Sequence, residues 1–209
     1  GRGAKTLVAG SQRPLNPFYF GLYGGSDSPG FLNADTDAGP FFLSQGYQPS
    51  ESVLVFQRKL DQPLGIVDTR FANLKRRFDV QVSPRMEVGT WWDECIQGQI
   101  EPEPMQFRME EKKSGLVAAS LTLWEMESYS WRWNYPAAGV ISSFVRPEFR
   151  RQGLGKYLFA HVLRYLQEQF FGVVESQCPQ SNEAAAALFR SLGFEAIDVG
   201  RTYRKEVSS

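Results

Sequence analysis

The chain has 209 residues, and its 23 Lys and Arg are matched by 23 Asp and Glu, so the formal net charge is zero. That length fits one domain or two small ones, and a hydrophobic fraction of 42% excludes a wholly disordered chain. The charge balance argues against general affinity for nucleic acid or an anionic membrane, and no stretch approaches the roughly 20 apolar residues of a membrane helix.

The first 60 residues are rich in glycine and aromatic residues and poor in charge. Apolar, β-prone runs bounded by Gly and Pro predict strands over Lys5–Ala9 and Phe18–Tyr23, and Val53–Phe56 predicts a third. Between them, Asn33–Gln45 is expected to hold a short helix that ends near Gly46. The chain opens without Met and without a signal-peptide pattern, so we expect these residues to be the middle of a larger fold.

Residues 61–77 contain a proline, a glycine and the basic cluster Lys75-Arg76-Arg77, and we expect a linker with one helical turn. With zero net charge, a solvated linker explains this cluster better than a nucleic-acid site, which stays open as an alternative. A strand over Phe78–Val82 and a helical stretch around Trp91–Ile96 are predicted next.

The rest of the chain alternates strand-like and helix-like patterns. The predicted elements are a hairpin of Met105–Glu110 with Leu116–Met126, a strand over Gly139–Val145, a helix over Gly153–Phe170, a strand over Val173–Cys178, a helix over Asn182–Leu192 and a strand over Phe194–Tyr203. This order is typical of a mixed α/β sheet.

Basic residues and glycines concentrate where one predicted strand ends and the long helix begins. The run from Arg146 to Lys156 contains Arg150, Gly153 and Gly155. A helix N-terminus offers unpaired N–H groups and the positive end of the helix dipole, and glycine lets the backbone approach an anion closely. The segment therefore predicts a phosphate or pyrophosphate cradle, although its spacing is neither that of a P-loop nor that of a Rossmann turn.

Two blocks resemble a known family. The run Arg150-x-x-Gly153-x-Gly155 resembles the Arg/Gln-x-x-Gly-x-Gly/Ala acetyl-CoA signature of the GNAT superfamily of N-acetyltransferases. The segment Asn182–Phe194 resembles that family's Asn-x-x-Ala-x-x-Leu-Tyr-x-x-x-Gly-Phe helix, with the spacing intact. The resemblance covers about residues 78–205. It implies the α/β acyl-CoA N-acyltransferase fold and direct transfer of an acyl group from acetyl-CoA to an amine, without a metal.

The resemblance also implies roles for individual residues. Acetyl-CoA would lie in a V-shaped slot between the strands Gly139–Val145 and Val173–Cys178, with its pantetheine amides paired to Phe144 and Val145 as if it were an added strand. Asn182 would face the pantetheine arm, and Phe189 would lie near the thioester. The residues whose amides would hold the pyrophosphate are Arg150, Arg151, Gln152, Gly153, Leu154, Gly155 and Lys156.

The group that protonates the leaving thiolate is not indicated. Many family members have Tyr in place of Phe189, and Phe cannot donate a proton. Tyr203, Tyr157 and Cys178 are substitutes, water is another, and a thiol of pKa about 8.5 also leaves unassisted at neutral pH.

For the general base, the candidates are Glu125 and Glu127, near the end of a predicted strand, with Glu175 behind them. A solvated glutamate at a strand end is the competing interpretation for each of them. The one histidine, His161, lies on an apolar stripe of the long helix and is expected to be a packed structural residue.

The acceptor is expected to be a small-molecule or peptide amine, and no nucleic acid or membrane partner is expected. Aromatic residues at Trp91-Trp92 and over Tyr129–Tyr135 either line an acceptor pocket or pack between domains. The two cysteines, Cys95 and Cys178, cannot form a disulfide framework, which favours a reducing, cytoplasmic location. The sequence does not indicate the oligomeric state.

An internal repeat links the two ends of the chain. Phe41–Tyr47 aligns with Leu188–Phe194, which places Asp35 on Asn182. We therefore predict a partial, degenerate GNAT-like unit over residues 1–60, a linker over residues 61–77 and a GNAT N-acetyltransferase domain over residues 78–209. The alternative function is a non-catalytic acyl-CoA-binding or regulatory module.

Overall fold

The computed structural model describes residues 4–10, 25–83, 91, 94–95 and 104–207. The predicted strand Phe18–Tyr23 and most of the helical stretch around Trp91 lie outside these residues. Within the described ranges, no helix is long and apolar enough to cross a membrane.

The strands and helices follow the predicted order closely. The strands are β1 (Thr6–Ala9), β2 (Phe31–Leu32), β3 (Gln48–Lys59), β4 (Phe78–Ser83), β5 (Met105–Glu111), β6 (Val117–Glu125), β7 (Ala137–Val145), β8 (Val173–Pro179) and β9 (Glu195–Glu206). The helices are α1 (Ala38–Ser44), α2 (Phe71–Arg77), α4 (Glu127–Trp133), the 3₁₀ turn η1 (Pro147–Phe149), α5 (Leu154–Glu168) and α6 (Glu183–Ser191).

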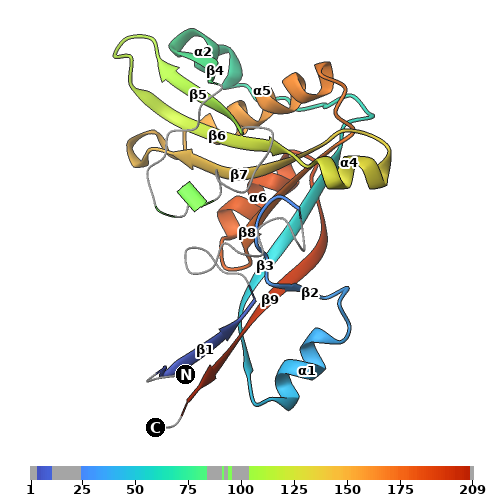
Figure 1. Ribbon diagram of the computed structural model, residues 1–209. Helices are drawn as coiled ribbons and strands as arrows, with labels where there is room; N and C mark the ends of the chain where they lie inside the picture. Colours follow the sequence, from blue (N-terminus) through green and yellow to red (C-terminus); the bar gives the residue numbers. More distant parts are fainter. Residues whose placement is uncertain (1–3, 11–24, 84–90, 92–93, 96–103, 208–209) are drawn as a thin grey trace.

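All the described strands belong to one sheet, of order β1-β9-β3-β8-β7-β6-β5-β4, with β2 paired to β9 beside β1. The β7–β8 pair is parallel and the other pairs are antiparallel. Figure 1 shows β3 and β9 running together from the upper part of the molecule down to α1 and to both ends of the chain. The sheet is therefore mixed, as the sequence predicts.

The two faces of the sheet bury different sets of side chains, because side chains alternate along a strand. On one face, Val174 belongs to the main hydrophobic core, which α5 and α6 cover; the rings of Phe159 and Phe189 lie 5.3–5.6 Å from neighbouring aromatic rings there. On the other face, Val173 packs with Met126 in a smaller cluster beneath α4. The central strands are thus covered on both sides.

The predicted repeat is present as a local two-fold arrangement around β3 and β9. In the repeat alignment, each residue of the first copy corresponds to the residue 147 positions later, as Gly46 does to Gly193. Val53 of β3 pairs with Gly200 of β9, which is its own counterpart in that alignment. The pairing is symmetric about Val53 and Gly200. On one side Gln57 pairs with Glu195, and on the other side Gln48 pairs with Arg204, which are the counterparts of Glu195 and Gln57 in the alignment. The irregularities in register also occur on both sides.

The helices before β3 and β9 repeat the same local geometry. The side chains of Asp35 and Asn182 accept hydrogen bonds from the backbone N–H groups three residues later, at 3.2 and 3.1 Å. Gly46 and Gly193 both adopt a positive φ, of 77° and 78°, which ends each helix in the left-handed conformation that glycine favours. The same sequence pattern has therefore produced two helices that end in glycine and lead into a strand, although α1 has Asp37 as its N-cap and begins two aligned positions later than α6.

Two expectations about organisation change with the structure. The linker over residues 61–77 holds more than a single turn, because α2 spans Phe71–Arg77 and buries Leu74. Residues 48–59 form β3, which lies between β8 and β9 and therefore joins the first repeat to the sheet of the second. The continuous apolar run Val53–Phe56 predicts this strand but carries no information about its partners.

Candidate functional site

The strands β7 and β8 form a slot because they pair over only part of their length. Their parallel ladder contains three residue pairs and ends where Gly139 lies opposite Glu175. Toward their carboxyl ends the two strands keep their other neighbours, since Ser142–Val145 pairs with β6 and Ser176–Pro179 pairs with β3. The predicted separation of these strands is therefore present, and we call the last pair, Gly139 and Glu175, the apex of the slot.

The shape of β7 favours this separation. Its register against β6 shifts between Val140 and Ser142, which leaves Ile141 as the additional residue of a β-bulge. A bulge bends its strand and increases the local twist. It lies just past the apex, and Phe144 farther along β7 is 51% exposed. An extended ligand can enter here as an added strand, the mode by which strand edges bind peptides.

The cradle lies at the wide end of the slot, between the end of β7 and the start of α5. After η1 the chain turns through Arg151 and Gly153, which both have positive φ values, of 62° and 89°. The first bond of α5 runs from the N–H of Tyr157 to the carbonyl of Gly153 at 3.0 Å. The N–H groups of Leu154 to Lys156 therefore precede the helical ladder, as those of any first turn do.

Three side chains of the cradle brace the turn itself. The Arg150 Nε donates to the carbonyl of Val145 at 3.0 Å, and Arg146 Nε donates to the carbonyl of Val117 at 2.8 Å. The amide of Gln152 donates to the carbonyl of Glu148 at 3.1 Å. These bonds hold basic side chains beside the first turn of a 15-residue helix. The arrangement favours an anion there, through both charge and helix dipole.

The segment predicted as a linker adds a further basic residue to the cradle. The guanidinium of Arg70 lies against Gly153, since a Cβ built on that glycine would be 2.9 Å from Cζ of Arg70. Asp68 holds Arg70 with an ion pair of 2.7 Å, and Lys156 Nζ lies 3.7 Å from the same carboxylate. Hydrogen bonds from Arg70 keep the pKa of Asp68 well below its usual range. The sequence signal for Arg70 is only an Asp-x-Arg before a short helix.

Asn182 and Phe189 lie on α6, beside the slot. Asn182 caps the helix through its side chain. Phe189 is 3% exposed, and its ring packs against those of Phe56, Phe159 and Phe194. The ring that stands where many family members have Tyr is thus buried and packs against three other aromatic rings.

The substitutes for a thiolate-protonating tyrosine are widely separated. Tyr203 stacks on Phe42 in the first repeat, with ring centroids 5.1 Å apart, and Tyr157 lies on the outer side of α5. Cys178 is on β8 itself, and burial raises the pKa of its thiol to about 11. Only Cys178 therefore belongs to a strand of the slot, and it is protonated at neutral pH.

The carboxylates near the slot differ in burial. Glu125 pairs with Ala138 at the end of β6 and is half-buried, and Glu127 begins α4 and is exposed. Glu175, at the apex, is 1% exposed. Burial raises the pKa of this carboxyl, and hydrogen bonds from uncharged donors oppose that shift in part.

The aromatic segment Tyr129–Tyr135 divides between packing and exposure. Tyr129 and Trp133 pack against the smaller cluster, with ring centroids 5.2 Å apart, while Trp131 is 86% exposed. Packing thus accounts for Tyr129 and Trp133, whereas the exposed Trp131 is not explained by packing. The pair Trp91-Trp92 lies largely outside the described residues.

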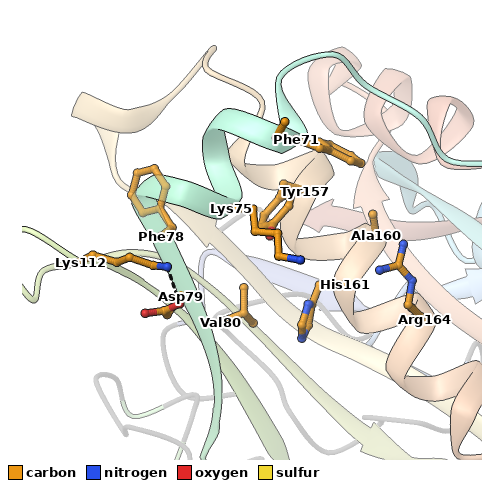
Figure 2. Close-up of a pocket in the computed structure, with 11 residues that line it drawn as sticks. Phe71, Lys75, Phe78, Asp79, Val80, Lys112, Tyr157, Ala160, His161 and Arg164 are labelled. Carbon is orange, nitrogen blue, oxygen red and sulfur yellow. Dashed lines mark ion pairs between the residues drawn. The ribbon is translucent and has the colours of Figure 1, made fainter.

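A cavity of about 510 Å³ lies on the outer side of α5, away from the slot. Figure 2 shows Lys75 and Tyr157 above His161, with the ion pair of Lys112 and Asp79 at one side. His161 is therefore half-buried at a cavity wall and not fully packed in an apolar stripe. Burial and the nearby Arg164 lower its pKa. The Lys75 of the basic cluster also lines this cavity.

Comparison with protein families gives one match, to the acetyltransferase (GNAT) family, over residues 79–194. Among curated proteins, the ribosomal protein bS18-alanine N-acetyltransferases of Escherichia coli K12 and Salmonella typhimurium are 37% identical over 66 residues. That alignment covers 32% of this chain and 45% of each relative, so the chain matches less than half of their length.

Several solved structures share the fold. A GCN5-related glucosamine N-acetyltransferase region of a fungal multi-domain protein gives a TM-score of 0.65 at 17% identity, over 97% of this chain and 26% of that one. A tandem GNAT protein from the clavulanic acid biosynthesis pathway gives 0.63 at 17% identity, over 98% and 65%. A GCN5-related N-acetyltransferase from Sphaerobacter thermophilus gives 0.59 at 18% identity, over 86% and 59%.

Proposed function

Because the chain belongs to the acetyltransferase (GNAT) family, we propose that it is an N-acetyltransferase that transfers an acetyl group directly from acetyl-CoA to an amine. The observation that carries this proposal is the junction of slot and cradle: two strands part after the apex, and the slot opens beside a basic helix N-terminus. Acetyl-CoA, when bound, supplies an activated thioester. The chain's own residues bind, orient and shield that thioester.

The residues proposed to hold acetyl-CoA fit its chemistry. The backbone edge of Phe144 and Val145 can pair with the amides of the pantetheine arm, because an extended strand offers donors and acceptors in the same spacing. The backbone of Arg150–Lys156 can accept the pyrophosphate, with Asn182 and Phe189 beside the arm. Gly153 matters because its φ of 89° is a conformation that residues with a side chain rarely adopt.

Positioning is expected to supply much of the rate. Holding two reactants in a near-attack geometry removes a large entropic barrier, and no covalent enzyme intermediate is needed. The amine must lose a proton before or during attack, and Glu125 and Glu127 remain the proposed bases. A thiol is a fair leaving group near neutral pH, so Phe189 in place of Tyr is compatible with turnover.

The acceptor class is proposed as a primary amine. The curated relatives are named for alanine of a ribosomal protein, and one structural neighbour is named for glucosamine. A peptide that begins with alanine and glucosamine itself therefore belong in the panel of amines.

The test is thiol release from acetyl-CoA with that panel, alongside calorimetry of acetyl-CoA binding. The Arg150→Ala, Gly153→Asp double variant removes one charge and adds a carboxylate where Arg70 packs, so we expect at least about a hundredfold weaker binding, equivalent to roughly 2.7 kcal/mol. The matched control is Arg201→Ala on β9 with Gly46→Asp at the end of α1; Gly46 has a positive φ, as Gly153 has, and both sites are away from the cradle. Unchanged affinity in the cradle variant contradicts the proposal.

The second candidate, an acyl-CoA-binding module without catalysis, is favoured by one observation. Phe189 is buried among three aromatic rings, so the position of the usual tyrosine offers no proton donor. Tight binding of acetyl-CoA with no thiol release over the whole amine panel would establish this alternative and reject the enzyme.

A further inference from the structure

The two repeats differ most in the connection that leads from strand to helix. The strand β1 pairs with β9 as β8 pairs with β3, so the two strands are counterparts. Between β8 and α6 the chain has three residues, 180–182, whereas 28 residues, 10–37, separate β1 from α1. The first repeat therefore carries a long connection that its counterpart lacks.

The described part of this connection crosses to the second repeat and lies at the apex of the slot. Ser26 donates to Glu175 Oε1 twice, from its N–H at 2.9 Å and from its hydroxyl at 3.0 Å. A Cβ on Gly139 would lie 2.8 Å from Cα of Ser26, and one on Gly25 would lie 2.7 Å from Sδ of Met126. Both glycines are thus required by the close approach of the connection to the sheet.

The first repeat holds Glu175 from two directions. Besides the bonds from Ser26, the amide of Gln57 on β3 donates to Oε2 of Glu175 at 3.0 Å. A further bond comes from the second repeat, since Gln177 on β8 donates to Oε1 at 3.3 Å. Tyr129 of α4 and Asp27 of the connection are the ionisable groups that lie beside this arrangement. A buried carboxylate satisfied by neutral donors is costly unless every donor keeps its place. The connection is therefore fixed at this point.

The geometry places this contact on the face of the sheet that the long helices do not cover. Val174 and Cys178 face the core beneath α5 and α6, so Glu175 faces the opposite side, where Tyr129 packs. From the apex to Val145 the slot runs for six residues, about 20 Å at roughly 3.3 Å per residue. An extended arm whose pyrophosphate occupies the cradle points its other end toward the apex.

We propose that residues 25–30, which precede α1, form the acceptor-side wall of the acyl-transfer site, and that Ser26, held by Glu175, is a positioning residue that limits how far the amine reaches. The proposal rests on the acetyltransferase function proposed above. It means that the first repeat, which has no described cradle, contributes to the reaction by closing the site of the second. Amine selectivity would then depend on a segment far from the cradle in sequence.

The first test is hydrogen exchange, because it needs no turnover. We expect acetyl-CoA to slow exchange of residues 25–30 more than CoA does, while α1 stays unchanged, and Glu175→Gln to remove that difference. Protection of residues 150–156 without any at 25–30 would overturn this proposal and leave acetyl-CoA binding intact. No protection at either segment would mean that acetyl-CoA does not bind, and both proposals would then fail.

The second test separates positioning from simple stabilisation. For Ser26→Ala we expect about a tenfold rise in KM for the amine, the size of one lost hydrogen bond near 1.4 kcal/mol, with acetyl-CoA affinity unchanged. The matched control is Ser44→Ala, which also removes one hydroxyl hydrogen bond, in this case to the backbone carbonyl of Phe41 in α1 at 2.7 Å. Reduced stability with an unchanged KM for the amine would assign Ser26 a structural role only and reject the proposal.

Discussion

The two repeats of this chain show how one local pattern is put to different uses. Both contain a capped helix, a glycine with positive φ and a strand, and the two strands pair with each other about a local two-fold axis. Within the described residues, the second repeat alone places its helix beside a slot and a predicted cradle. In the first, α1 leaves Phe41 and Leu43 more than half exposed. Capping and turn chemistry thus specify the element, and the neighbouring strands specify its function.

The largest expected difference between the repeats concerns their central aromatic residues. Phe189→Ala should lower the free energy of unfolding by about 3–5 kcal/mol, because it removes a buried ring that packs against three other aromatic rings. Phe42→Ala, at the equivalent position, should cost less because that ring is half-buried. Chemical denaturation of the two variants measures both values. Equal losses would contradict the view that only the second repeat has a complete core.

The helix-ending glycines provide the next comparison. Either substitution by Ala places a side chain in the left-handed region, at a cost of about 1–2 kcal/mol. At Gly193 a Cβ would also meet Arg58 Nη1 at 2.6 Å, whereas at Gly46 the nearest atom is Lys205 Nζ at 3.6 Å. Gly193→Ala should therefore be the more destabilising in thermal unfolding. A larger effect at Gly46 would mean that the first repeat tolerates less strain than its described packing indicates.

A pH titration tests the position where the repeats differ in charge. Glu175 on β8 pairs with Gln57, and the equivalent residue of the first repeat is Val8 on β1, which pairs with Arg204. Of Glu175 and Val8, only Glu175 has an ionisable side chain. Burial raises the folded-state pKa of Glu175 above its ordinary value of 4.5. The folded protein then retains a proton that the unfolded chain has lost, so stability falls as pH rises from 4.5 through the folded pKa.

The matched variant is Glu175→Gln, which cannot titrate. Its stability relative to the wild type should rise with pH over that window, by at most about 1.4 kcal/mol per pH unit. Denaturation at several pH values measures this difference. Parallel curves for the two proteins would show that Glu175 keeps an ordinary pKa in the folded state.

The smallest expected effect concerns the two capping side chains. Asn182→Ala and Asp35→Ala each remove one acceptor from a helix N-terminus, for about 1 kcal/mol. Because Asn182 also lies beside the slot, only its substitution should weaken acetyl-CoA binding. Calorimetry of both variants checks this, and an equal loss of affinity would place Asp35, too, in contact with the ligand's site.

Sequence patterns predicted most of the elements because their signals are local. The period of apolar residues indicated α5, the Gly-containing turn indicated the hairpin of β5 and β6, and Asn182 with Gly193 bounded α6. The cradle was predicted for the same reason, since its chemistry comes from consecutive residues. Both features depend on neighbours in the chain, which a sequence displays directly.

The contributions of residues 61–77 and of the β1–α1 connection could not be predicted in this way. Arg70 lies on Gly153, and Ser26 lies on Gly139 and Glu175, across long separations in sequence. Neither residue has a local pattern that distinguishes it from a solvated surface residue. Their roles arise only when the sheet brings these segments against the cradle and the apex.

The sequence by itself indicated the family and predicted the cradle and the repeat, because each depends on residue types at short, fixed spacings. The tertiary structure decided how the repeats combine. Hydrogen-bonding along β3 and β9 merges them into one sheet, and the close approach that Gly139 permits brings Ser26 onto a buried carboxylate. Strand pairing and burial are non-local, so the chain must be folded before Glu175 has any donors to satisfy it.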